Sequence, residues 1–290
     1  MENAKRLMRS QCSLRPHSSN DSSRALPYYT PTMSRPLITL LICVIAIVGA
    51  WSLRARVSGK EGDHPEDRVQ QARLLREEKL RKLCSDNKLS YPPRRLFLRA
   101  MKWEQILEVW AGDDENKPLQ LLVTYPLTAF SGKLGPKRRE GDYQIPEGVY
   151  RIDRFNPRSS FHLSLGLNYP NESDRQLSDP KKPGSDIFIH GRAASVGCLA
   201  IGDEAIEELY VLARDVPGSA NGKITVHIFP ARMNDPEWKP AETREAKANP
   251  EILTFWESLL SIYNRFEETR KVPEVEVEKG GVYRLRDTAQ

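Results

Sequence analysis

The sequence lacks the motifs that hold a metal ion or a nucleotide. Its 290 residues contain no H-E-x-x-H pair, no paired C-x-x-C spacing and no glycine-rich phosphate loop. These patterns supply the ligands of zinc sites and the backbone N–H groups of nucleotide sites. We therefore expect neither a metal site nor a cofactor.

Positive charge is also low for a protein that binds nucleic acid. The formal net charge is +5 and the isoelectric point is about 8.9. No dense stripe of lysine and arginine is interleaved with aromatic residues, so the sequence predicts no nucleic-acid partner. An anionic polymer or a membrane surface is compatible with this charge. Hydrophobic residues make up 39% of the chain, which is enough for one core, and nothing indicates a second.

Cysteine is scarce in the part of the chain that can fold. Cys12 and Cys43 precede or lie within an apolar tract, which leaves only Cys84 and Cys198. A disulfide framework has more cysteines than this. A single bond between Cys84 and Cys198 therefore remains the alternative to a free, reactive Cys198.

The apolar tract, residues 37–53, carries no charge and lies between Arg35 and Arg54. At about 1.5 Å per residue it extends roughly 25 Å, the short limit for crossing a bilayer core. As a signal anchor it would leave the basic, disordered residues 1–36 in the cytoplasm. As a signal peptide it would be cleaved after Ala50.

In both interpretations the rest of the chain is exported from the cytoplasm. We therefore expect a periplasmic or cell-envelope protein, either anchored in the inner membrane through residues 37–53 or secreted. Met33, shortly before the tract, is an alternative start that would leave residues 1–32 untranslated.

Three further regions follow the tract. Residues 58–90 combine a polar linker with an amphipathic helix at 67–83, which we expect to form a stem. Residues 94–230 are rich in strand patterns and form the expected central domain. Residues 231–290 form a C-terminal appendage with a helix that docks on the domain.

The domain itself is predicted to be mainly β, sandwich- or barrel-like, with a few helices. The alternation of apolar and polar residues predicts strands at 95–101, 105–110, 119–125, 149–152, 185–190 and 223–229. The apolar periodicity predicts helices at 203–214 and, in the appendage, 251–268. We expect Asp203 to cap the first of these helices.

The chemistry lies where the strand ending in His190 leads to Cys198, eight residues later. An imidazole or a helix N-terminus lowers the pKa of a cysteine and produces the nucleophilic thiolate. Gly197 lets the backbone come close, so the amides of Gly197 and Cys198 could bind an oxyanion. The alternative is an inert buried thiol, but a polar, glycine-containing loop is an unusual place for one.

Three spaced motifs resemble the YkuD-type L,D-transpeptidase catalytic domain and its YafK-like branch. They are GPKRREGDYQIPEGVY at 135–150, FHLSLGLNYPN at 161–171 and HG…SVGC at 190–198. The segments VHIFP at 226–230 and FW…FE at 255–267 are similar to the same branch. The resemblance covers roughly residues 94–280 and implies an L,D-transpeptidase-type fold.

Carried over to this chain, the resemblance implies that Cys198 is the nucleophile and His190 the general base. Ser195 and Gly191 would shape the loop, and Gly197 and Cys198 would supply the oxyanion amides. The chain departs from most of the family at Val196, which replaces a second histidine. Residues 199–201 also lack the Arg or Asn that commonly follows the motif.

Three other sites are weaker candidates. His162 either reaches the substrate pocket or caps a turn. Lys137, with Arg138 and Arg139, either recognises substrate carboxylates or belongs to a solvated loop. His227 lies opposite the apolar face of its strand and is predicted to be a solvated or hydrogen-bonded histidine.

The resemblance implies two-step acyl transfer on peptidoglycan stem peptides through a thioester on Cys198. An amine acceptor makes the protein a transpeptidase, and water makes it a hydrolase that releases wall-linked protein or peptide. A rival from another class is a non-catalytic wall-binding module, against which the presence of both Cys198 and His190 argues. We also predict no Cys84–Cys198 disulfide, because it would consume the nucleophile.

Overall fold

The structure, a computed structural model, describes residues 65–286, which lie in one compact unit, Lys60–Gln290. The tract at 37–53, the segment 1–36 and the alternative start at Met33 lie outside the described residues. No helix within residues 65–286 is long and apolar enough to cross a membrane.

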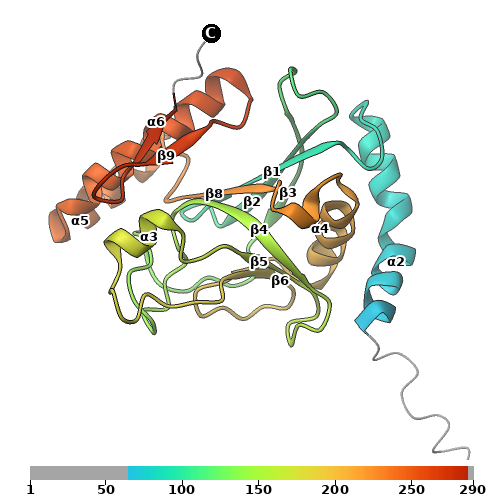
Figure 1. The fold of residues 1–290 in the computed structure, drawn as a ribbon, viewed down its shortest axis with the longest axis horizontal. Helices are drawn as coiled ribbons and strands as arrows, with labels where there is room; N and C mark the ends of the chain where they lie inside the picture. The colour runs from blue at the N-terminus through green and yellow to red at the C-terminus, as the bar shows by residue number, and fades with distance from the viewer. Residues whose placement is uncertain (1–64, 287–290) are drawn as a thin grey trace, which may run out of the picture. The chain divides into compact units, whose positions relative to one another are not determined.

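A mixed, eight-stranded sheet forms the centre of the described residues (Figure 1). Its order is β3-β2-β1-β8-β4-β5-β6-β7. The strands are β1 (Arg95–Met101), β2 (Ile106–Gly112), β3 (Gln120–Pro126), β4 (Gly148–Asn156), β5 (Ser164–Leu167), β6 (Phe188–His190), β7 (Leu199–Ala200) and β8 (Thr225–Phe229). The pairs β1–β8 and β6–β7 are parallel, and the other neighbours are antiparallel.

The sheet curls until its two edges meet. Ala129, just after β3, forms a bridge with Ala200 in β7, and the Thr128 N–H donates to the Ala200 carbonyl at 2.8 Å. The sandwich- or barrel-like, mainly β prediction is therefore confirmed in its coarse form, as a curled half-barrel. Because the last strand lies against the start of the 127–147 loop, this loop borders the residues that precede β7.

The helices lie at the two ends of the sheet (Figure 1). They are α2 (Pro65–Asp86), α3 (Glu172–Leu177), α4 (Asp203–Asp215), α5 (Lys239–Ala248) and α6 (Glu251–Thr269), with short 3-10 turns η1 (Ser219–Asn221) and η2 (Pro236–Trp238). A small hairpin of β9 (Val275–Val277) and β10 (Tyr283–Leu285) follows α6.

The predicted strands and helices are present with small shifts in their bounds. The strand predicted at 185–190 is shorter than expected and is ordered as β6 only from Phe188 to His190. Asp186 adopts a left-handed backbone conformation with φ 55°. Extended strands cannot pass through that conformation, so the strand begins after it.

Helix α2 packs against α4 through opposite charges. Arg73 binds Asp215 at 2.5 Å, Arg76 binds Glu207 at 2.7 Å, and Lys79 binds Glu208 at 2.5 Å. The apolar residues of α2 divide between its two sides. Leu74 is 86% exposed and Leu75 58% exposed, whereas Val69, Ala72, Leu80 and Cys84 are buried.

Helix α6 packs against the sheet through a second apolar cluster. Its buried residues are Ile252, Phe255, Trp256, Leu259, Ile262, Tyr263 and Phe266. Met101 at the end of β1, Phe229 at the end of β8 and Leu134 in the 127–147 loop belong to the cluster around most of them. Burial of each large apolar side chain contributes roughly 1.5–3 kcal/mol, so α6 is an integral layer of the fold.

A buried ion pair anchors the 127–147 loop between the sheet and α6. Lys102 Nζ lies 2.9 Å from Glu147 Oε1, and both side chains are completely buried. Lys102 also donates to the carbonyls of Gly135 and Ile145, and Glu147 accepts from the Trp256 indole N–H at 2.7 Å. Every charged group of the pair therefore has partners, as burial of charge requires.

His227 differs from the prediction that it is solvated or hydrogen-bonded. Its side chain is fully buried in β8, and neither ring nitrogen has a hydrogen-bond partner among the described residues. The ring lies edge-on to Phe97 and Phe229, at centroid distances of 4.7 and 5.7 Å. The correction arises because α6 covers this face of the sheet, which no local pattern around His227 reveals.

Replacement of His227 by leucine should reduce the acid sensitivity of the fold. Burial, with a smaller effect of Arg99, lowers the pKa of His227 from 6.5 to about 3. A depressed folded-state pKa means that the stability contribution is present above pH 6.5 and is lost as the pH falls towards 3. Urea unfolding at pH 7 and pH 4 should show a loss about 3 kcal/mol smaller in His227→Leu than in the natural protein. Equal losses in the two proteins would contradict this assignment.

Candidate active site

Two adjacent parallel strands carry Cys198 and His190. The register of β6 and β7 pairs Ile189 with Leu199 and His190 with Ala200. Extending it back by one residue places Cys198, directly before β7, beside Phe188. Successive side chains on a strand alternate between its faces, so Cys198 and His190 share a face. The opposite face, with Ile189 and Leu199, is buried in the core.

A backbone carbonyl sets the tautomer of His190. The ring is 2% exposed, and its Nδ1 lies 2.6 Å from the Gly191 carbonyl oxygen. A carbonyl can only accept, so Nδ1 carries the proton and Nε2 is left with its lone pair. Burial lowers the pKa of His190 below 6.5. The imidazole is therefore neutral at neutral pH and able to accept a proton through Nε2.

The Cys198 thiol is half-buried and unionised at neutral pH. Burial raises its pKa above 9.0, while the Phe188 backbone and the charge of Lys137 lower it to a smaller extent, and Asp186 raises it. The Sγ atom lies 3.8 Å from the Asp186 carbonyl oxygen. The Sγ atom makes no hydrogen bond to His190. The resting pair is thus a neutral thiol and a neutral imidazole.

Ser195 organises the loop before the nucleophile. Its Oγ accepts from the amides of Gly197 at 3.2 Å and Cys198 at 3.1 Å, and it donates to the Cys198 carbonyl at 2.7 Å. A second contact joins it to Ser131 Oγ at 3.1 Å. The two amides that the sequence suggested as oxyanion donors therefore bind Ser195 in this conformation and are not free.

The packing around the loop leaves no room for a side chain at Gly191 or Gly197. A Cβ on Gly191 would lie 2.5 Å from Asp203 Oδ1 and 2.8 Å from the Phe161 carbonyl oxygen. Gly197 has φ +118°, and its Cβ would lie 2.9 Å from the Gln144 carbonyl oxygen. All three distances are shorter than a Cβ atom tolerates, so each position admits only glycine without rearrangement.

The helix after the loop differs from the prediction in two ways. Gly202 is the N-cap of α4 and no side chain caps it, while the carboxylate of Asp203 accepts from the Arg192 N–H at 2.6 Å. Strand β7 also separates Cys198 from the helix. Asp203 therefore holds the turn after His190, and Cys198 is not at a helix N-terminus.

The weaker candidates lie in two different places. His162 has φ 74° and its Nε2 lies 2.8 Å from Glu207 Oε1 in α4, so the ring is paired with a helix carboxylate. Lys137 is only 4% exposed and is paired with Asp142 at 2.5 Å. It is therefore not part of a solvated cluster. Its aliphatic chain meets Gly184, two residues from the carbonyl that faces Cys198.

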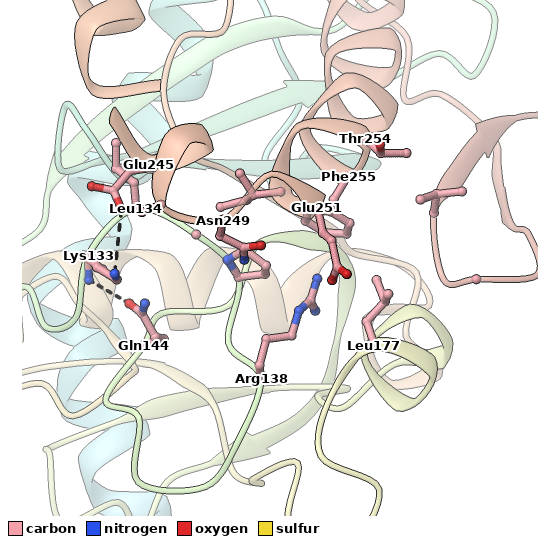
Figure 2. Close-up of a pocket in the computed structure, with 16 residues that line it drawn as sticks. Lys133, Leu134, Arg138, Gln144, Leu177, Glu245, Asn249, Glu251, Thr254 and Phe255 are labelled. Carbon is pink, nitrogen blue, oxygen red and sulfur yellow. Dashed lines mark hydrogen bonds and ion pairs between the residues drawn. The ribbon is translucent and has the colours of Figure 1, made fainter. Parts of the chain in front are cut away.

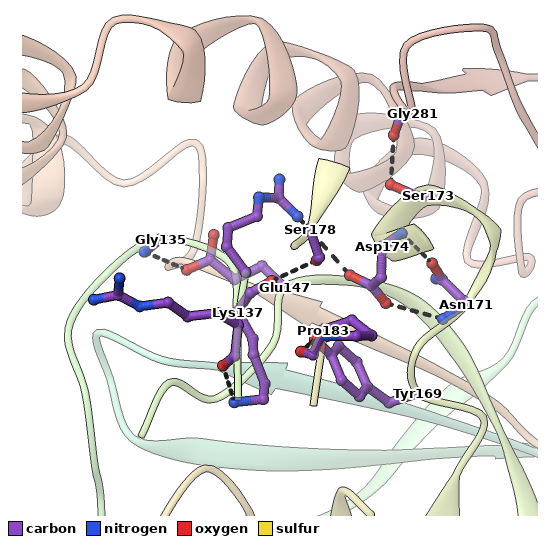
Figure 3. A network of polar contacts seen from close by, with 12 residues as sticks. Gly135, Lys137, Glu147, Tyr169, Asn171, Ser173, Asp174, Ser178, Pro183 and Gly281 are labelled. Carbon is purple, nitrogen blue, oxygen red and sulfur yellow. Dashed lines mark hydrogen bonds and ion pairs between the residues drawn. The ribbon is translucent and has the colours of Figure 1, made fainter. Parts of the chain in front are cut away.

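The 127–147 loop is hydrogen-bonded to the segment that follows β5 (Figure 3). Ser178 Oγ donates to the Lys137 carbonyl at 3.4 Å, and the Asp179 N–H donates to the Arg138 carbonyl at 2.8 Å. In the same network, Asp174 accepts from the Tyr150 hydroxyl and from the Asn171 N–H. Burial raises the pKa of Asp174 to about 6.

Several residues around the thiol were not singled out by sequence reasoning. Asp186 and Phe188 contribute backbone groups, Gln144 packs against Gly197, and the Phe161 ring lies 4.6 Å from the His190 ring. Phe161 and Gln144 do occur within the family-like motifs, which was the available signal. The contact of Ser131 with Ser195 joins positions 64 residues apart and has no local signature.

Within the part of the chain that the structure describes, no group of three or more His, Cys, Asp or Glu side chains is placed to hold a metal ion. The arrangement instead offers a thiol, a proton acceptor on the same face of the sheet and a loop of fixed shape. Such a set of groups suits nucleophilic attack by sulfur on a carbonyl.

Comparison with known proteins agrees on the family. Residues 104–228 match the family YkuD, the L,D-transpeptidase catalytic domain. The chain is 32% identical over 187 residues to the protein named "Putative L,D-transpeptidase YafK" of Escherichia coli K12, covering 64% of this chain and 72% of that one. The protein of the same name in Escherichia coli O157:H7 matches equally.

Solved structures show weaker similarity. The helical cell shape determining protein Pgp2 of Campylobacter jejuni has 18% identity and a TM-score of 0.39, covering 64% of this chain and 73% of that chain. Bd1075 of Bdellovibrio bacteriovorus has 20% identity and a TM-score of 0.34, covering 66% and 76%. The family assignment rests on the sequence matches and on the motifs that form the site. The chain belongs to the YkuD family of L,D-transpeptidase catalytic domains.

Proposed function

We propose that the protein is an L,D-transpeptidase that acts on peptidoglycan stem peptides with Cys198 as its nucleophile. The observation that carries the proposal is the pairing of a half-buried thiol with a neutral imidazole on the same face of neighbouring strands. His190 Nδ1 is held by Gly191, which leaves Nε2 as the proton acceptor. The relative in Escherichia coli that is 32% identical to the chain is named a putative L,D-transpeptidase, which supports the same activity.

The proposed reaction has two acyl-transfer steps. Cys198 Sγ attacks the carbonyl of the L-centre in the peptide, and its proton passes to His190 Nε2. The C–N bond to the D-residue breaks, and the leaving amine takes the proton from His190. The thioester then accepts an amine from a second peptide and Cys198 recovers its proton.

The resting state bears on how the first step begins. Because burial raises the pKa of Cys198 and lowers that of His190, the proton moves during attack and not beforehand. The tetrahedral oxyanion also needs donors. The amides of Gly197 and Cys198 become available if the substrate oxygen replaces Ser195 Oγ, to which they now donate.

We also propose that the protein works in the cell envelope, exported through residues 37–53 and either anchored there or released. Mass spectrometry of the mature N-terminus distinguishes the two forms. An intact tract indicates an anchor, and a chain beginning at Trp51 indicates cleavage.

Product analysis tests the function directly. Incubation of the protein with a disaccharide tetrapeptide, followed by mass spectrometry, should give crosslinked or amino-acid-exchanged products. Loss of the terminal residue without exchange would identify the hydrolase, which shares the thioester. If no thioester or product forms while wall fragments still bind, the enzyme assignment fails and the protein is a wall-binding module.

A further inference from the structure

A separate pocket lies between residues 133–144 of the 127–147 loop and the start of α6 (Figure 2). Its volume is about 430 Å³, and its lining includes neither Cys198 nor His190. The walls come from the loop, the α5–α6 junction and the turn of the β9–β10 hairpin. The residues that matter below are Lys133, Arg138, Gln144, Glu245, Glu251 and Phe255.

Arg138 offers the pocket a guanidinium whose donors are unused. Its side chain makes no hydrogen bond to any described residue, and its buried Nη1 has no hydrogen-bond partner. Asp174 Oδ1 lies 3.9 Å from Nη1, which is too far for a hydrogen bond. Unsatisfied buried donors are unfavourable and call for an explanation. The exposed part of the same guanidinium offers further donors, which match a carboxylate bound side by side.

The position of Arg138 is fixed without these donors. Its Cζ lies 4.9 Å from the centroid of the Phe255 ring, a cation–π contact. Its backbone N–H donates to Asp142, and its carbonyl accepts from Asp179. The side chain is 30% exposed, so a ligand can approach it. The arginine is therefore held in place before any ligand binds.

The opposite wall of the pocket carries a negative charge. Figure 2 shows Arg138 reaching from the loop towards Glu251, the exposed first residue of α6. Glu251 has no ion-pair partner among the described residues. By contrast, Glu245 lies 3.8 Å from Lys133 and 3.4 Å from Arg244. Asp174, the carboxylate 3.9 Å from Arg138, is buried and does not line the pocket. Arg138 and Glu251 thus present one cation and one anion to a ligand, which favours a zwitterion over a phosphate or a dianion.

Gln144 connects the pocket with the nucleophile. Its side-chain oxygen accepts from the Lys133 N–H at 2.7 Å inside the pocket wall. Its backbone oxygen lies against Gly197, 2.9 Å from where a Cβ would be. Gln144 therefore contacts both the loop of Cys198 and the pocket wall, so the pocket borders the region in front of the nucleophile.

We propose that this pocket binds the zwitterionic amino-acid end of the peptide substrate, with its carboxylate on Arg138 and its ammonium group beside Glu251. The inference rests on the proposed function, because that function makes the ligand a peptide. It adds a specificity site to the nucleophile: peptides with a free amino-acid end within a few residues of the reacting carbonyl are selected.

Binding to an unreactive protein tests the pocket without relying on turnover. The probe is a disaccharide tetrapeptide containing a diamino acid with a free amino-acid end, titrated calorimetrically into the full chain with Cys198→Ala. Adding Arg138→Gln should weaken binding about 10- to 100-fold, and Arg138→Lys should weaken it less. Arg265→Gln, which changes an exposed arginine of α6 outside the pocket lining, is the matched control and should bind as before.

Chemical capping of the probe separates the two charges. Amidation of the end carboxylate should abolish the difference between Arg138 and Arg138→Gln proteins. Acetylation of the end amine should abolish the difference caused by Glu251→Gln, a surface change that leaves the fold intact. Equal affinity of all three peptides for the Cys198→Ala protein, or no binding at all, overturns the proposal. Binding that depends on Arg138, in a natural protein that forms no product, upholds the pocket and refutes the proposed function.

Discussion

Cys198→Ala should lower the rate of product formation from a disaccharide tetrapeptide by at least ~10³-fold, because no other group replaces a missing nucleophile. The same change should abolish the covalent mass increase that the natural protein shows with a carbapenem or a thiol-directed probe. The rate of labelling should continue to rise as the pH passes 9, since burial raises the pKa of this thiol above 9.0. Intact-protein mass spectrometry measures both.

Two matched variants give the prediction its specificity. Cys84 is the other free thiol among residues 65–286, and it is completely buried, with a pKa raised to about 11 by burial. Cys84→Ala should therefore remain active and acylated. His190→Asn should keep the thiol but lose about 10²- to 10⁴-fold in rate, because it removes the proton acceptor. Full activity of Cys198→Ala, or loss of acylation in Cys84→Ala alone, would refute the assignment.

Glu147→Ala should lower the free energy of unfolding by about 3–5 kcal/mol, because it leaves the buried ammonium group of Lys102 without its counter-charge. It also removes the acceptors of the Trp256 indole N–H and the Gly135 N–H. Burial already lowers the pKa of Lys102, and Glu147 opposes that shift. Urea unfolding followed by tryptophan fluorescence measures the loss, because Trp256 contacts the mutated carboxylate.

A double-mutant cycle separates the pair from its surroundings. Lys102→Met combined with Glu147→Leu should recover a large part of the lost stability, since a buried ion pair can be replaced by apolar groups at little net cost. Asp86→Ala, which removes an exposed partner of Lys82, is the control and should cost less than about 1 kcal/mol. Additive effects of Lys102→Met and Glu147→Leu would contradict a direct interaction.

The regular elements of this fold follow from local patterns. The alternation at 95–101 and the apolar periodicity at 251–268 correspond to β1 and α6 almost residue for residue. Where the backbone leaves the ordinary regions, local patterns fail. Asp186 shortens β6, and Gly202, not Asp203, is the N-cap of α4. These deviations depend on what neighbouring segments allow, which the local sequence does not contain.

At the candidate site, too, some features follow from local patterns and others from contacts between distant segments. The order of a strand, His190, Gly191 and Cys198 suggested a nucleophile, and the family-like motifs around it favoured that interpretation over an inert buried thiol. The direction of the loop amides was not predictable, since it depends on Ser195 and on its contact with Ser131. Neither was the fate of Lys137, which looks like a solvent-exposed charge in sequence and is buried against Asp142 and Gly184.

By itself, the sequence determined that this is a mainly β chain with a cysteine and a histidine in the motif of one family, because such motifs and periodicities are properties of short segments. The tertiary structure alone decided which face of the sheet is buried, which amides are free and where Arg138 lies. Those features arise when α6, the 127–147 loop and β7 meet across long sequence separations. Burial and hydrogen bonding between distant segments, not local propensity, set the charge state and the surroundings of each group.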